Sequence, residues 1–235
     1  SWYNFLSDPS FTGTKNLSEH AAKLQQLVAV HPRVSSLLVA LAKTHLKMGW
    51  DARGTGPAEL VTEDGRRQMA EHAATAKKLL EQAIAIGVQD GGAHMLLLDI
   101  ARIEGQPIAT ARQIFADGRK QDRDYANLYQ SMAEYLLPRW HGQPGDAERF
   151  ACEIAREMLG DDGIDVFLQI AYNVNQFDTN LLFWGEYDRG LLSKAAELAV
   201  KRHAEARNLV PFAALCTIAA QDHAAAQRVR PFVKY

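Results

Sequence analysis

Apolar residues recur at steps of three and four along most of the chain, the period of an α-helix with one buried face. One example comprises Leu37, Leu38, Leu41, His45 and Met48. The same period returns in residues 69–84, 108–115, 128–136, 150–158 and 167–174, and two apolar runs, 191–207 and 210–220, close the chain. Alternation of apolar and polar residues, typical of a half-buried strand, never persists beyond a few positions. The pattern predicts an all-α fold.

Short segments rich in Gly, Pro or Asp separate the predicted helices. They are His31-Pro32, 87–92, 105–107, 142–144, 160–163 and Gln221-Asp222. Ser35 and Asp161 or Asp162 carry oxygen atoms that can cap the start of a helix. Because connections of a few residues force neighbouring helices to run antiparallel, the sequence predicts helical hairpins in a bundle or a solenoid.

Small residues favour the solenoid. In residues 97–118 an apolar helix ends at Gly105, and the next predicted helix carries Ala111, Phe115 and Gly118 at steps of four and three. This resembles the tetratricopeptide pattern, in which small residues let paired helices approach closely. We expect a single helical-repeat domain over residues 1–235, a tetratricopeptide-like α-solenoid or irregular helical array. Residues 1–16 are expected to form an extended or loosely packed segment.

Charge and hydropathy exclude two classes of partner. The chain of 235 residues carries 26 basic and 28 acidic side chains, which give a net charge of -2. Because basic residues are interspersed with acidic ones, the chain lacks the basic excess that binding to a phosphate backbone requires. The longest apolar stretches fall short of the roughly 20 residues that cross a bilayer. We expect neither a nucleic-acid partner nor a membrane span.

Two segments place a Trp and an Arg beside glycines where a helix-patterned run ends. Residues 49–56 read Gly-Trp-Asp-Ala-Arg-Gly-Thr-Gly, and residues 136–142 read Leu-Leu-Pro-Arg-Trp-His-Gly. Arg53 lies three positions after Trp50, so its guanidinium can stack on the indole or bond to carbonyls left unpaired at the helix end.

In the second segment, Pro138 breaks the helix, which leaves Arg139 and Trp140 to pack back over exposed carbonyls. We interpret both motifs as structural seals between hairpins, with His141 as a further motif residue. The alternative is a ligand or partner pocket lined by Trp and Arg.

The two motifs, together with the C-terminal hairpin, resemble those of a family of bacterial helical-repeat proteins that contain a domain of unknown function. The resemblance extends from about residue 20 to the end of the chain. It implies a tetratricopeptide-like α-fold and brings no reaction, substrate or ligand. His141 stands where that pattern leads us to expect a second small residue, which leaves the role of the motif open.

The cysteines and the start of the chain bear on its compartment. Cys152 and Cys216 each lie among apolar helix residues, far apart in sequence, which favours two small buried side chains over a disulfide or a reactive thiol. Because the chain begins with Ser1, we expect that an N-terminal segment has been removed. Both the bacterial cytoplasm and the periplasm therefore stay open.

Residues 173–189 offer the richest surface for recognition. Amide and carboxylate groups there form versatile hydrogen bonds, and aromatic side chains are enriched at protein interfaces. The candidate partner-binding residues are Asn173, Asn175, Gln176, Asp178, Asn180, Trp184, Tyr187 and Arg189. The alternative is an irregular loop whose aromatics dock into the core and whose polar residues cap the flanking helices.

Catalytic signatures are absent from the sequence. It contains no His-Glu-x-x-His, Cys-x-x-Cys or Gly-x-Ser-x-Gly motif and no phosphate-binding Gly-rich loop. None of the eight histidines has a neighbour at metal-ligand spacing on a shared helix face. Glu186 and Asp188 flank Tyr187, but two positions apart on a helix they face different directions. We expect no enzyme activity, no cofactor and no metal.

The expected function is therefore non-catalytic. Repeat folds expose extended grooves, so we expect a protein-interaction or scaffold module that binds a protein or peptide between stacked hairpins. An immunity or inhibitor protein for a bacterial toxin or secreted enzyme is the alternative, with one tight partner. An enzyme with an unconventional site ranks third.

Overall fold

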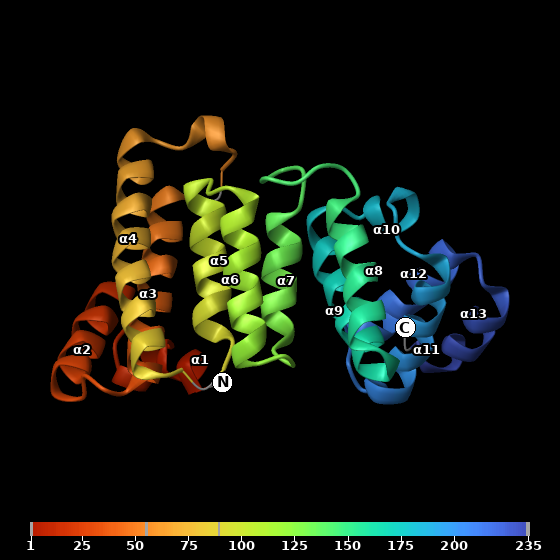
Figure 1. Ribbon diagram of the computed structural model, residues 1–235, viewed down its shortest axis with the longest axis horizontal. Helices are drawn as coiled ribbons and strands as arrows, with labels where there is room; N and C mark the ends of the chain where they lie inside the picture. Colours follow the sequence, from red (N-terminus) through yellow and green to blue (C-terminus); the bar gives the residue numbers. More distant parts are fainter. Residues whose placement is uncertain (1, 55, 89, 234–235) are drawn as a thin grey trace. The chain divides into compact units, whose positions relative to one another are not determined.

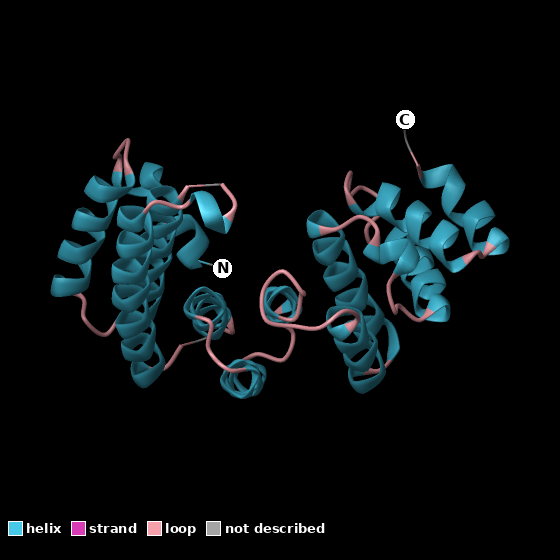
Figure 2. Ribbon diagram, turned by 90° about the horizontal axis from the view of Figure 1, so that it is seen from above, coloured by secondary structure: helices cyan, strands magenta, loops and turns pink. Residues whose placement is uncertain are grey.

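The computed structural model describes residues 2–54, 56–88 and 90–233, and all regular structure in these ranges is helical (Figure 2). The all-α prediction is confirmed. The chain divides into two compact units, Ser1–Leu128 and Tyr129–Tyr235, and the single helical-repeat domain stays a prediction. No described helix is both long and apolar enough to span a bilayer.

Among the described residues, the N-terminal unit contains six complete helices, two 3₁₀ turns and the start of a seventh helix (Figure 1). They are α1 (Trp2–Leu6), η1 (Pro9–Thr12), α2 (Leu17–Val30), α3 (Ser35–Arg53), η2 (Ala58–Leu60), α4 (Glu63–Ile86), α5 (Gly92–Glu104), α6 (Ile108–Gln121) and α7 (Ala126–Tyr135). Residues 1–16, for which the sequence predicts an extended or loosely packed segment, include α1 and η1. Asp8 caps η1 by accepting a hydrogen bond from the backbone N–H of Ser10 at 2.8 Å.

Helices α3 and α4 form the central pair of this unit and lie side by side in Figure 1. Their facing apolar residues, among them Leu41 and Leu80, are fully buried. Two glycines let the helices approach closely where α3 ends and α4 begins. A Cβ at Gly65 would lie 2.8 Å from the carbonyl oxygen of Ala52, and one at Gly49 would lie 2.8 Å from Sδ of Met69.

As far as residue 233, where the described part of the chain ends, the C-terminal unit consists of the rest of α7, six further helices and one 3₁₀ turn. They are α8 (Asp146–Met158), α9 (Gly160–Phe177), α10 (Leu181–Trp184), α11 (Arg189–Arg202), α12 (Leu209–Ala220), α13 (His223–Val229) and η3 (Arg230–Phe232). The core includes the fully buried aromatics Tyr129, Tyr135 and Phe167. Helix α11 packs against both α9 and α12.

Three helix ends differ from the sequence-based expectation. Ser35 is the first residue of α3, and Val34 occupies the capping position without a side-chain hydrogen bond. Helix α9 begins at Gly160, so Asp161 and Asp162 lie in its first turn and do not cap it. The turn expected at residues 160–163 is instead the single residue Leu159, whose φ is 60°.

Helix α11 ends at Arg202, five residues before the end of the expected run. The basic residues at this end contact the first turns of α9. Arg202 Nη1 bonds to Asp162 Oδ1 at 2.8 Å, and His203 Nε2 lies 2.6 Å from Asp165 Oδ1. Acidic residues that looked like helix caps therefore serve mainly as partners of another helix.

Candidate functional site

The first motif closes the C-terminal end of α3. The guanidinium of Arg53 lies over the Trp50 ring, 5.4 Å from its centroid, and Nη1 donates to the carbonyl oxygens of Gly54 at 3.1 Å and Gly56 at 3.3 Å. Both contacts expected from the sequence are thus present. Thr55 of this motif lies outside the described residues. Arg53 satisfies carbonyls beyond the last helical turn, as a capping side chain does.

The second motif folds the chain back onto the end of α7. The backbone N–H of His141 donates to the Tyr135 carbonyl, and that of Gly142 donates to the Leu137 carbonyl, both at 3.3 Å. A Cβ at Gly142 would lie only 1.7 Å from the carbonyl oxygen of Leu136, so no other residue fits without moving the loop. His141 also packs on Tyr135, with ring centroids 4.8 Å apart.

Arg139 is exposed and contacts two aromatic rings, of which that of Trp140 is half-buried. Its guanidinium carbon lies 5.6 Å from the Trp140 centroid and 5.5 Å from that of Phe177 at the end of α9. Such cation–π contacts contribute about 0.5–1 kcal/mol at exposed sites. The motif therefore connects the α7–α8 loop to the last turn of α9, next to the predicted partner-binding segment.

The predicted partner-binding residues occupy three different settings. Asn173 and Asn175 are half-buried, and the side-chain amide of Asn173 donates to Glu134 on α7 at 2.8 Å. Gln176, Asp178, Asn180, Trp184 and Arg189 are exposed, with Asp178 and Asn180 in the connection between α9 and α10. Arg189 reaches Gln221 at 2.9 Å. Five of the eight candidates are thus accessible to a partner, and two are partly so.

Tyr187 is the exception and corrects the prediction for this residue. Its side chain is only 8% exposed and packs edge-on against Phe167, with centroids 5.8 Å apart. The hydroxyl has no hydrogen-bond partner among the described residues. Burial raises the pKa of this phenol well above its ordinary value. The ring docks into the core because it buries a large apolar area, so Tyr187 cannot contact a partner in this conformation.

The acidic neighbours of Tyr187 belong to ion pairs, not to an acid/base pair. Glu186 pairs with Arg149 of α8, while Asp188 pairs with Arg156 at 2.8 Å and caps α11 through the Leu191 N–H. Their neighbour Glu148 on α8 is buried and only 1% exposed. Burial raises the pKa of its carboxyl, against the smaller lowering effect of backbone N–H groups.

Both cysteines are buried and free. Cys152 accepts a hydrogen bond from the Asp188 backbone N–H at 3.4 Å. Burial raises the pKa of both thiols, in the case of Cys216 to about 12. A raised pKa makes the thiolate needed for nucleophilic or redox chemistry scarce near neutral pH.

Large apolar side chains on α10 and α12 are exposed. Trp184 is 85% exposed, although an indole of this size normally buries most of its surface. On α12, Pro211, Leu215 and Ile218 follow one another at steps of four and three and all face solvent, Ile218 with 61% of its surface exposed. Since α10 packs against α12, the C-terminal unit carries unpartnered apolar surface on two adjacent helices.

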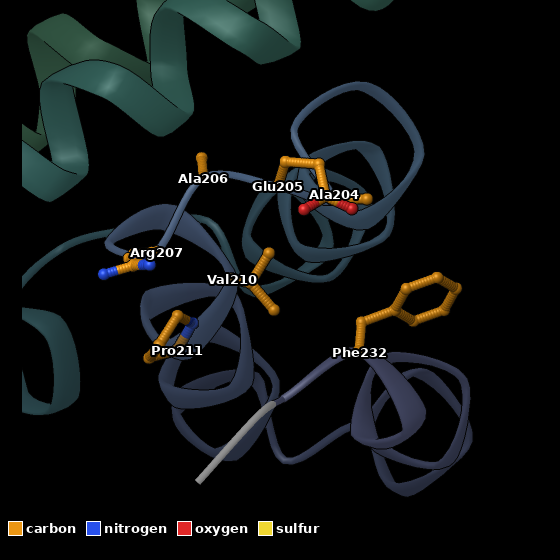
Figure 3. A pocket seen from close by; sticks show the side chains of 7 residues that line it. All are labelled: Ala204, Glu205, Ala206, Arg207, Val210, Pro211 and Phe232. Atoms are coloured by element: carbon orange, nitrogen blue, oxygen red, sulfur yellow. The ribbon is translucent and has the colours of Figure 1, made fainter.

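A cavity of about 420 Å³ lies beside the N-terminal end of α12 (Figure 3). Val210 and Pro211 of α12 and Phe232 of η3 supply its apolar lining, while Glu205 and Arg207 come from the α11–α12 connection. Arg207 extends to the side away from Phe232 in this view. Pro211 belongs to both the cavity and the exposed stripe of α12, so the two features are continuous.

Sequence reasoning missed two features of the structure, the exposed apolar face of α12 and a pair of neighbouring histidines. The run 210–220 was noted as apolar, but only the helical positions show that Pro211, Leu215 and Ile218 share an exposed face. His45 and His72 lie 27 residues apart on different helices, so a search along single helices does not pair them, although their Nδ1 atoms are 3.0 Å apart. No group of three or more His, Cys, Asp or Glu residues that could hold a metal occurs in the part of the chain that the structure describes.

Comparisons with protein-family profiles, curated protein sequences and solved structures found no match to this chain. The family resemblance of the two motifs therefore stays a prediction. Function has to be argued from the surfaces of the molecule itself.

Proposed function

We propose that the chain is a protein-interaction module that binds a protein partner through the C-terminal unit, with the Trp184 indole as the anchor. The observation that carries the proposal is the 85% exposure of this side chain. Trp is enriched among the few interface residues that dominate binding energy, because its ring buries a large area at low entropic cost. An indole projecting from a short helix suits insertion into an apolar pocket of the partner.

The surroundings of Trp184 support this proposal. Phe183 on the same helix and Leu215 on α12 are 41% and 39% exposed, which extends the apolar surface beyond one residue. Asp178, Asn180 and Arg189 lie before and after α10 in the chain and supply exposed polar groups. An apolar centre with a polar rim is the usual anatomy of a protein interface.

The test combines partner capture with a matched substitution. The purified chain and its Trp184→Ala variant are cross-linked in native lysate, and the captured proteins are identified by mass spectrometry. Leu60→Ala serves as the control, because Leu60 is also a large exposed apolar residue, 75% exposed, but lies in the N-terminal unit. Binding of the recovered partner to all three proteins is then measured by calorimetry.

We expect Trp184→Ala to weaken binding by about 30-fold or more, which corresponds to the roughly 2 kcal/mol of an interface hot spot. Leu60→Ala should leave the affinity unchanged. The urea midpoint of Trp184→Ala should equal that of the parent, since an exposed ring contributes little to the core. Equal affinity of both variants for the partner contradicts the proposal.

A further inference from the structure

Two histidine side chains face each other in the N-terminal unit, far in sequence from the proposed partner surface. His45 lies on α3 and His72 on α4, and their Nδ1 atoms are 3.0 Å apart. The ring centroids are separated by 5.3 Å, and the ring planes are inclined by 39°. Both side chains are half-buried, so the pair is shielded but reachable from solvent.

Gly49 of the first motif lies close to this pair. It lies one helical turn after His45, and a Cβ at this position would be 3.2 Å from Cβ of His72 and 2.8 Å from Sδ of Met69. Contacts of this length require the Met69 side chain to move and Cβ of His72 to give way by a few tenths of an ångström, so a larger residue disturbs the packing of α3 on α4 at this level. The glycine therefore leaves room for the packing that holds the two imidazoles side by side.

The short contact between the two rings needs one hydrogen-bond donor and one acceptor. At 3.0 Å one Nδ1 atom donates its proton to the lone pair of the other, which requires both rings to be uncharged or to share one proton. Neutral imidazole is the form that ligates a transition metal, because a protonated ring has no free lone pair.

We propose that His45 and His72 form a two-histidine binding site for a divalent transition metal ion, with Zn²⁺ or Ni²⁺ as suitable occupants. Imidazole nitrogen is a preferred ligand of both ions. With metal–nitrogen bonds of about 2.0–2.1 Å and a tetrahedral angle, two nitrogens lie about 3.3 Å apart. The present separation needs to widen by only about 0.3 Å, while the rings turn so that both lone pairs point at the ion.

The His72 side of the pair borders an open hollow. His72 lines a hollow of about 550 Å³ together with Lys15, Lys47, Asp51 and Gln68. No third His, Cys, Asp or Glu completes the set among the described residues, so water or a small exogenous ligand occupies the other positions. Two lysines against one carboxylate favour an anionic exogenous ligand.

Calorimetric titration of the full chain with Zn²⁺, near neutral pH and without phosphate or chelators, tests the site. We expect one ion per chain, and a loss of affinity of at least tenfold in both His45→Gln and His72→Gln. His31→Gln is the matched control, because His31 is exposed at the end of α2, and it should bind as the parent does. Far-ultraviolet circular dichroism verifies that each variant keeps its helical content.

A second measurement needs no variant. In a nuclear magnetic resonance titration of the unmodified chain, Zn²⁺ should shift the ring resonances of His45 and His72 together and lock both rings in the tautomer that carries the proton on Nε2. Unshifted ring signals, or undiminished binding by the His45→Gln/His72→Gln double variant, overturn the proposal. Residual binding that is equal in all proteins identifies adventitious sites on other histidines.

Discussion

The sharpest prediction concerns Gly142, the last residue of the second motif. In Gly142→Ala the new methyl group would lie 1.7 Å from the Leu136 carbonyl oxygen and 2.3 Å from its carbon. Real Cβ atoms essentially never approach closer than 3.0 Å, so the loop must retreat by more than about 1 Å. Because the obstacle is backbone, no side-chain rotation can relieve the contact.

The retreat breaks identifiable interactions. The loop loses the N–H bonds of His141 and Gly142 to the end of α7, each of which contributes about 1 kcal/mol net. It also loses the packing of His141 on Tyr135, a ring pair that contributes about 0.5–1.5 kcal/mol. We therefore expect Gly142→Ala to lower the free energy of unfolding of the C-terminal unit by about 2–4 kcal/mol.

Hydrogen exchange of peptides from α8 and α9, followed by mass spectrometry, measures this loss in the C-terminal unit alone. Gly160→Ala is the control in the same unit: its φ of +61° disfavours a side chain, but nothing lies within 4 Å of the added Cβ. It should cost about 1–2 kcal/mol from backbone strain. If Gly142→Ala costs no more than Gly160→Ala, the described packing of the loop on α7 is refuted.

Three further substitutions test buried and capping groups. Glu148→Gln replaces a buried carboxyl whose pKa is raised in the folded chain. The protonated carboxyl stabilises the fold at low pH, and this contribution is lost as the pH rises above the ordinary pKa of 4.5. The variant should therefore gain urea resistance relative to the parent at about pH 7 but not at about pH 4. Tyr187→Phe removes a hydroxyl without a described partner, so the urea midpoint should stay equal or rise; a loss above about 1 kcal/mol would reveal a bond that the structure does not show. Arg53→Ala should lower the free energy of unfolding by about 1 kcal/mol in urea titrations, and Arg53→Lys should recover only part, since an ammonium lacks the planar fork.

Helical periodicity predicted the class of the fold and the position of most helices, because burial of one face leaves a direct trace in the sequence. Glycine and proline signals located the breaks after α2, α4 and α5 correctly. The helix ends that were wrong are decided by tertiary contacts. Asp161 and Asp162 have the chemistry of caps, yet their partners Lys201 and Arg202 lie on α11, 40 residues away.

The partner-binding surface could be predicted from the sequence only in part, because tertiary contacts decide which of its side chains are exposed. Composition marked residues 173–189 as suited to recognition, and Trp184 is indeed exposed, but composition could not tell its indole from the phenol of Tyr187. Both rings are amphipathic and lie within two positions of Gly185, so only the packing of Phe167 against Tyr187 separates them. The His45–His72 pair was beyond sequence reasoning, because it depends on the register of two helices.

Because α3 and α4 approach closely at Gly49, the side chains at positions 49, 69 and 72 share one limited volume. The space that a side chain at position 49 would need is already filled by Met69 and His72, so the sizes of these residues cannot change independently. We expect that relatives with alanine or serine at position 49 carry a shorter side chain at position 69. Such compensated exchanges would show selection acting on the spacing of α3 and α4 more than on the identity of any single residue.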